Sequence, residues 1–167
     1  MLLKKLSHKR KKHLKHKIKA KGRHSIHSPF LFEAYEHCVK CKSQLSKRNR
    51  IIRKFKSINN TKHISKSKIE VKKHEFINCF SKQINTELAI INAANSKDYI
   101  ISHFESIENS KNTRFIIIDN IHSSNDATTA WEEIIIKENV SLSVDFYHLG
   151  LISISKDFTK QHFRLKM

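Results

Sequence analysis

The feature that most constrains the fold is a series of short apolar runs in the second half of the chain. Four runs predict strands: ELAIIN (87–92), RFIIID (114–119), SLSVDFY (141–147) and LISIS (151–155). The intervening stretches 97–110 and 126–137 show the apolar spacing that is typical of helices. This alternation predicts a parallel α/β layer with right-handed crossovers, and Gly150 predicts a tight antiparallel return between the last two strands.

The first part of the chain is strongly basic, and no acidic residue precedes Glu33. The whole chain carries 33 Lys and Arg against 15 Asp and Glu, a net charge of +18. This excess favours polyanionic partners: RNA, DNA or an anionic membrane surface. Apolar positions near one helical face (Leu3, Leu6, Leu14 and Ile18) allow a basic amphipathic helix, with a solvated, frayed terminus as the alternative. The candidate polyanion-contacting residues are Lys9, Arg10, Lys11, Lys12, Lys15, Lys17, Lys19, Lys21 and Arg23, with a second basic stretch over 40–56.

Three regions follow from these patterns. Residues 1–24 are expected to form a basic helical or disordered extension, 25–74 a helical and linker region, and 75–167 the α/β half. Gly22 is suited to end the first helix, and Pro29, preceded by Ser28, to begin the next. No window is long and apolar enough to span a membrane, and the start lacks an apolar leader segment. A reducing cytoplasm is the expected location.

Polar residues at two strand ends form the first candidate site. In a parallel sheet Asn92 and Asn95 would emerge on the same edge as Asp119, Asn120 and His122. Such groups could orient a substrate hydroxyl, or bind a divalent cation, weakly because only one ligand is charged. The alternative is that Asp119 and Asn120 cap the following helix.

A metal site is the second possibility. Cys38 and Cys41 have the spacing of half a zinc site, with His37 and Cys79 as conceivable further ligands. The second pair that a structural zinc site normally needs is absent, so ordinary helix cysteines are favoured. His24 and His27 are weak candidates for metal ligands.

Several segments, in order along the chain, resemble a family of bacterial class I S-adenosylmethionine-dependent methyltransferases. They are GRHSIHSPFLFEAYE, IDNIHSSNDATTAWEEI and VSLSVDFYHLGLISISKDFTKQHFRLK, and the resemblance covers roughly residues 15–40 and 84–167. It implies a partial Rossmann-like α/β sheet with an antiparallel C-terminal hairpin. ELAIIN would be the family's fourth strand and RFIIID its fifth. Asp119 and Asn120 would then stand where related O-methyltransferases bind a cation.

The departures from the family concern the cofactor. Only Gly22 and Gly150 are present, so the glycine-rich loop that lets the backbone approach S-adenosylmethionine has no counterpart. The family's acidic D-G-N-H is replaced here by Asn92-Ala93-Ala94-Asn95. A sheet without its first three strands would also expose the edge of ELAIIN. Either a partner chain, a second copy or residues 42–80 cover this edge, or the chain is a poorly stable remnant of a deleted gene.

The leading interpretation is therefore a shortened, degenerate methyltransferase-like protein, not catalytic alone and without bound S-adenosylmethionine. The first alternative is a basic nucleic-acid-binding module, RNA- or ribosome-associated, on an α/β scaffold. Because aromatic residues do not interleave with the basic runs, a dedicated reader of single strands is disfavoured. The second alternative is a methyltransferase active only with a partner that supplies the cofactor half.

Overall fold

A computed structural model describes residues 8–22, 25–39, 61–84, 87–110 and 113–167 of the chain. Two compact units are present: residues 1–26 group with 84–167, and residues 27–83 form the second unit. The basic N-terminal segment therefore belongs to the α/β unit instead of forming a separate extension, a division that differs from the one expected at residues 24 and 74.

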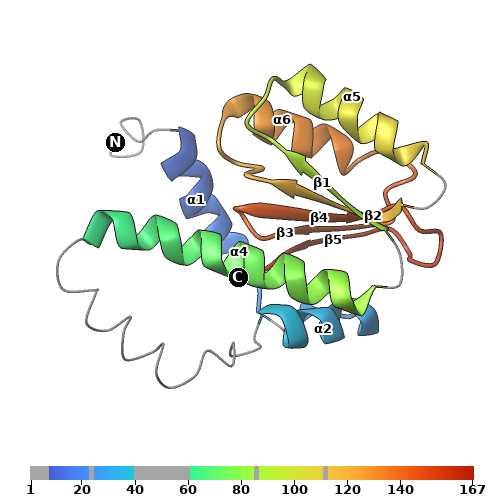
Figure 1. The fold of residues 1–167 in the computed structure, drawn as a ribbon, viewed down its shortest axis with the longest axis horizontal. Helices are drawn as coiled ribbons and strands as arrows, with labels where there is room; N and C mark the ends of the chain where they lie inside the picture. The colour runs from blue at the N-terminus through green and yellow to red at the C-terminus, as the bar shows by residue number, and fades with distance from the viewer. Residues whose placement is uncertain (1–7, 23–24, 40–60, 85–86, 111–112) are drawn as a thin grey trace. The chain divides into compact units, whose positions relative to one another are not determined.

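The α/β unit is built on a mixed sheet with the strand order β1-β2-β4-β3-β5 (Figure 1). The strands are β1 (Glu87–Asn92), β2 (Thr113–Asp119), β3 (Leu142–Asp145), β4 (Leu149–Ser153) and β5 (Gln161–Arg164). β1 and β2 are parallel, β4 runs antiparallel to both β2 and β3, and β5 is parallel to β3. The predicted parallel strands and antiparallel return are confirmed, whereas β5 was not predicted because QHFR has only one apolar residue.

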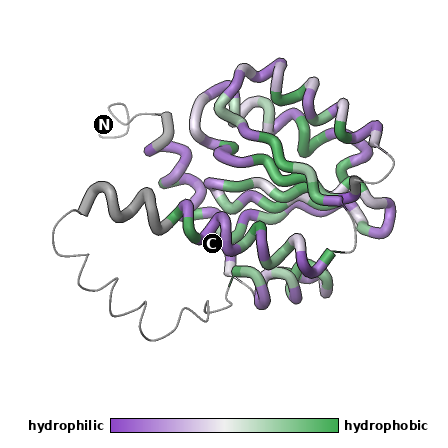
Figure 2. The backbone as a smooth tube through the Cα atoms, viewed as in Figure 1, coloured by the Kyte–Doolittle hydropathy of each residue, from purple (hydrophilic) through white to green (hydrophobic). Residues whose placement is uncertain are grey.

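Two amphipathic helices, α5 (Lys97–Glu108) and α6 (Asn125–Ile134), cover one face of the sheet. Each begins at a serine, Ser96 or Ser124, whose hydroxyl accepts a hydrogen bond from a backbone N–H in the first turn. Apolar side chains of the strands and helices form one buried cluster, which includes Phe104, Ile118 and Trp131. Figure 2 shows runs of hydrophobic residues along the strands, and hydrophilic residues alternating with hydrophobic ones along the helices.

Gly150 lies inside β4 and not in the turn before it, so this detail of the prediction is wrong. A Cβ atom at Gly150 would lie 2.4 Å from Cζ3 of Trp131, because the indole ring packs directly on the strand. The return between β3 and β4 is instead made around Tyr147, whose φ is 72°. Position 150 therefore needs glycine because a larger side chain would clash with Trp131, and not because the position forms a turn.

Helix α1 (His8–Lys19) precedes a short segment that joins the sheet. The helix ends before Gly22, and the Lys21 N–H donates to the carbonyl of Arg164 at 2.8 Å, forming a parallel bridge with Leu165 at the end of β5. A helix is thus confirmed over the described residues, but Leu14 and Ile18 of the predicted apolar face are exposed and His16 and Ala20 are buried instead. Leu3 and Leu6 lie outside the described residues. The segment joins the α/β unit at the strand nearest the C-terminus.

The second unit contains α2 (Pro29–Ala34), the π-helical turn η3 (Tyr35–Val39) and α4 (Thr61–Gln83). Ser28 caps α2 and Pro29 occupies its first turn, as predicted. The rings of Phe76 and Phe80 stack with centroids 5.6 Å apart and are both buried. The 23-residue helix α4 begins within the region expected to be helical and linker over 25–74, while 40–60 lie outside the described residues. No helix among the described residues is long and apolar enough to cross a membrane.

Candidate functional site

Three of the polar residues predicted at one sheet edge, Asn92, Asp119 and Asn120, lie together there, whereas His122 contacts Asp145. Asn92 and Asp119 are paired at the carboxyl ends of β1 and β2, and the Ala93 N–H donates to the Asp119 carbonyl at 2.9 Å. The Asn92 side chain accepts from the Ala94 N–H at 3.0 Å, and the Asn120 amide donates to the Asp119 carboxylate at 3.0 Å. Asn95 is exposed in the turn after β1. These side chains therefore stabilise the two turns.

The alternative role for Asp119 and Asn120 as helix caps is wrong. Ser124 caps α6, and its hydroxyl accepts from the Ala127 N–H at 3.0 Å. Asn120 has a left-handed backbone, with φ of 62°, and its N–H donates to the His148 carbonyl at 2.7 Å. Asparagine tolerates this conformation better than most residues, which accounts for its place in the turn.

A second polar group, which we call the His–Asp cluster (His16, His122 and Asp145), is buried at the end of β3. Nε2 of His122 lies 3.0 Å from Oδ2 of Asp145. Nε2 of His16, on α1, lies 3.2 Å from Oδ1 and 3.0 Å from the backbone carbonyl of the same residue. Asp145 is 2% exposed and also accepts from the Tyr147 N–H at 2.7 Å. The cluster therefore joins α1 to the carboxyl end of the sheet.

The electrostatics of the cluster favour an ionised carboxylate facing protonated histidine. Burial acts to raise the pKa of Asp145, but the hydrogen bonds from His122 and His16 hold it well below its usual value. Burial acts to lower the pKa of His16, but its hydrogen bonds to Asp145 raise it above the usual value. Burial, with the nearby Asp145 charge, raises the pKa of Tyr147 to about 12. Between the unperturbed pKa values of 3.8 for aspartate and 6.5 for histidine, Asp145 and His16 attract each other as an ion pair.

The arrangement does not leave His122 ready for general acid–base chemistry. Its Nδ1 lies 3.3 Å from the Thr128 hydroxyl, which itself donates to the Ser124 carbonyl at 2.9 Å, so both ring nitrogens have partners within the protein. Only 6% of His122 is exposed. A general base needs a lone pair that reaches the substrate. The geometry instead suits a structural connection between α1, α6 and the sheet.

Sequence reasoning missed His16, Asp145 and Tyr147 as members of one group. A usable signal was present, because SLSVD ends an apolar run in an aspartate as RFIIID does. His16 could not be found in this way, since its partner lies 129 residues away and a histidine in a lysine-rich helix looks like any other polar position.

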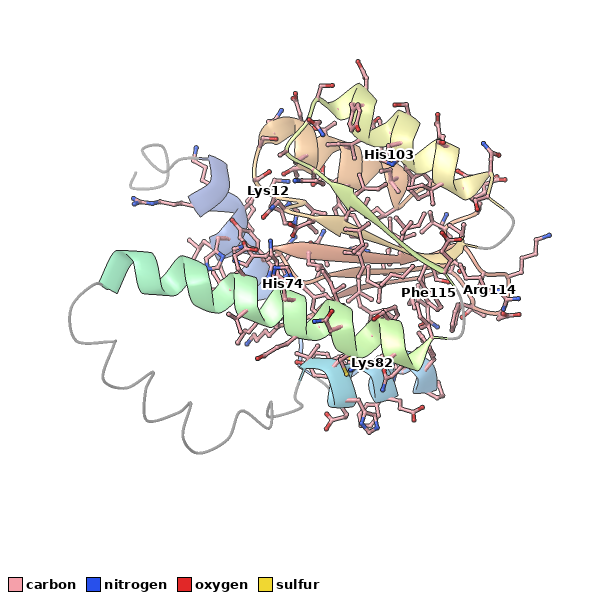
Figure 3. All side chains as sticks on the ribbon, viewed as in Figure 1. Lys12, His74, Lys82, His103, Arg114 and Phe115 are labelled. Atoms are coloured by element: carbon pink, nitrogen blue, oxygen red, sulfur yellow. The ribbon has the colours of Figure 1, made fainter. Side chains whose placement is uncertain are left out.

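Most of the charged side chains of α1 point away from the His–Asp cluster and are exposed to solvent. His16 and Ala20 are buried, and the His13 ring packs against Tyr147 with centroids 4.5 Å apart. Lys12 Nζ lies 2.7 Å from Glu132 Oε1 on α6 (Figure 3). The exposed cations define the basic face of α1: Arg10, Lys11, Lys15, Lys17 and Lys19, with Lys21 just beyond the helix.

Of the predicted polyanion-contacting residues, Lys12 is therefore turned toward the α/β unit. Arg23 and the whole basic stretch 40–56 lie outside the described residues, as does the side chain of Lys9. The remaining six are exposed. Five of them lie on α1, whose position is held by the buried His16 and Ala20.

The cysteine residues do not form a metal-binding group among the described residues. Cys38 Sγ lies 3.2 Å from the Gln83 side-chain oxygen, and Cys79 Sγ lies 3.6 Å from the His37 carbonyl. Cys41 and His24 lie outside the described residues, and His27 is exposed. The contacts of Cys38 and Cys79 link α4 to η3.

Comparison with protein-family models, with curated proteins and with solved structures found no match to this chain. Its function must therefore be inferred from its own residues and geometry.

Proposed function

We propose that this chain is a nucleic-acid-binding module in which the basic face of α1 contacts phosphates, on a methyltransferase-like α/β scaffold that does not act catalytically alone. The observation that carries the proposal is the docking of α1. His16 and Ala20 are buried against the α/β unit, while five cations elsewhere on the helix and Lys21 just beyond its end remain exposed. A like-charged segment is thereby held as an ordered surface.

We expect the docked helix α1 to bind nucleic acid more tightly than a disordered basic tail would. In a disordered basic tail, each long side chain and the backbone lose conformational freedom on binding, and this cost reduces the net free energy. In the docked helix the backbone is already fixed, so phosphate contacts are made at lower entropic cost. No acidic residue occurs before Glu33, so no carboxylate within this segment competes for the cations.

The size of the electrostatic contribution can be estimated from counterion release. Six phosphate contacts give a slope of about −5 for log affinity against log salt on duplex DNA. Affinity should then fall by about a thousandfold between roughly 50 and 200 mM salt. Phosphate contacts of this kind are independent of sequence, so different sequences of one nucleic acid should bind with similar affinity.

Fluorescence anisotropy with labelled RNA and DNA over this salt range tests the proposal. Replacing Arg10, Lys15 and Lys17 with Gln should weaken binding and reduce the salt slope by about 3. A matched control replaces three exposed cations elsewhere, Lys72, Lys82 and Lys156, and should change the slope little. Absence of binding to any nucleic acid at about 50 mM salt would refute the function.

The methyltransferase-like ancestry has its own support. Strand β4 runs antiparallel to β2 and β3 and lies between them, an arrangement that agrees with the antiparallel C-terminal hairpin implied by the resemblance. Calorimetric titration with S-adenosylmethionine tests the proposed loss of cofactor binding: micromolar binding to the isolated chain would refute it. A partner that restores such binding would favour a methyltransferase divided between two chains. A neighbouring reading frame that encodes a glycine-rich βαβ segment would point to that partner.

A further inference from the structure

The basic face of α1 has a more specific pattern than a uniform layer of charge. With 3.6 residues per turn, Leu14 and Ile18 point in directions about 40° apart and form the centre of the exposed side. Arg10 and Lys17 form one row about 70° to one side of this centre, and Lys11 and Lys15 form a second row about 60° to the other. Leu14 is 43% and Ile18 is 76% exposed, so the apolar centre is open to a ligand.

Two cation rows around a narrow apolar centre fit a groove with a phosphate strand on each wall. An α-helix with its side chains is about 10–12 Å wide, and the major groove of B-form DNA is about 12 Å wide. A helix placed there would direct one row to each strand and its central residues to the base edges. Apolar side chains at the groove floor can contact thymine methyl groups.

Other polyanions match the pattern less well. The major groove of an A-form RNA duplex is deep and narrow and does not admit side chains in this way. Single strands are usually held by aromatic stacking, and residues 8–19 contain no Phe, Tyr or Trp. A helix that lies in a membrane interface needs an apolar face about 100° wide, whereas two residues about 40° apart provide a narrow strip.

We infer that the basic face of α1 binds in the major groove of duplex DNA, with Leu14 and Ile18 toward the groove floor and a cation row on each phosphate strand. This inference rests on the proposed function and makes it specific to one nucleic acid and one groove. The buried His16 and Ala20 hold the opposite side of the helix against the α/β unit, so the orientation of both rows is fixed by the fold.

The test compares the full chain with two matched double variants, Arg10→Gln/Lys17→Gln and Lys11→Gln/Lys15→Gln. Binding to a DNA duplex of about 20 base pairs, two helical turns, should lose about 2 from the salt slope in each variant, because each row contacts its own strand. A large loss in one variant only would mean that a single strand is contacted, and would overturn the groove assignment.

A chemical probe identifies the groove directly. Dimethyl sulfate methylates guanine N7, which lies in the major groove, so the bound chain should protect guanines of the duplex from this reagent. Duplex DNA should also bind at least about tenfold more tightly than a single strand or an RNA duplex of the same length. Unprotected guanines or equal affinities would overturn the inference while leaving nucleic-acid binding itself intact.

A third measurement separates failure of the inference from failure of the proposed function. The same chain is mixed with vesicles made of equal parts phosphatidylserine and phosphatidylcholine, and binding is followed by co-sedimentation. Binding to vesicles without binding to any nucleic acid would overturn both, and would assign Leu14 and Ile18 to the lipid interface. Circular dichroism of each variant checks that α1 remains folded.

Discussion

The most informative perturbation is Asp145→Asn, which removes the charge of the His–Asp cluster and keeps the size of the side chain. Asp145 accepts hydrogen bonds from His122, His16 and the Tyr147 N–H, at 2.7–3.2 Å. An Asn side chain keeps one acceptor oxygen, and its NH₂ group can donate to Nε2 of His122 only when that ring is neutral and carries its proton on Nδ1. The variant therefore loses the ion pairing and confines His122 to one neutral tautomer.

The expected cost follows from burial. Removing one partner from a buried ion pair destabilises a protein by about 3–5 kcal/mol, because the remaining charge stays desolvated. His16→Ala removes only the link to α1 and leaves the His122 pair, so about 2–3 kcal/mol is expected from lost charge-assisted hydrogen bonds. His103→Ala on α5, where the ring meets Tyr99 edge to face, is the control and should cost much less (Figure 3).

The assay combines urea unfolding with hydrogen exchange. The 12-residue helix α1 has like charges four residues apart and is too short to persist without tertiary contacts. In His16→Ala the amides of α1 should therefore exchange rapidly while those of β2 and β4 remain protected. If Asp145→Asn costs less than about 1 kcal/mol, or if α1 stays protected in both variants, the cluster does not hold the helix.

Four further outcomes are expected. Stability should be greatest between about pH 4 and 6.5. The pKa of Asp145 is lowered on folding, so its stabilising contribution is present above the unfolded value of 3.8 and is lost as the pH falls through the folded pKa. The pKa of His16 is raised on folding, so its contribution is fully present below the unfolded value of 6.5 and is lost as the pH rises through the folded pKa. Thermal melts should show this optimum, and His16→Ala should flatten its alkaline side. Gly150→Ala should cost at least about 1–3 kcal/mol in urea unfolding because its Cβ meets Trp131, and an unchanged midpoint would contradict that packing. Ser124→Ala should cost about 1 kcal/mol through loss of the α6 cap, whereas the exposed Ser123→Ala should be near neutral. Phe80→Ala should cost about 3–5 kcal/mol and increase proteolysis of α4, and resistance equal to that of the unaltered chain would argue against its burial with Phe76.

Local sequence patterns predicted the elements that depend on local periodicity. The bounds of β1 were predicted without error, and α5, α6, β2 and the start of α2 were close, because apolar spacing and serine or proline signals report directly on short-range structure. β5 was missed because apolar and polar residues do not alternate in QHFR. Its pairing with β3, which local sequence does not reveal, makes this segment a strand. Gly150 was misread because glycine marks both turns and close packing, and Trp131 lies far from it in sequence.

The candidate site was only partly predictable for the same reason. The pairing of Asn92 with Asp119 followed from two parallel strands ending in polar residues. The attachment of α1 did not, because it depends on one buried carboxylate that joins residues 129 positions apart. Composition reported the charge of the N-terminal segment but carried no information about which of its side chains face the protein.

The contacts that hold α1 in its orientation connect the stability of the docked helix with the proposed binding of DNA. A chain whose competent form is only partly populated binds with an apparent affinity reduced by that fraction. If the undocked helix cannot present both cation rows, weakening the His–Asp cluster until α1 is docked one-tenth of the time lowers DNA affinity about tenfold, although none of the three residues contacts DNA. By reciprocity, phosphates that neutralise the like-charged helix favour its docked form. Variants of Asp145 and His16 therefore connect the fold with the proposed interface, because the same substitution should change both α1 protection and DNA affinity in proportion.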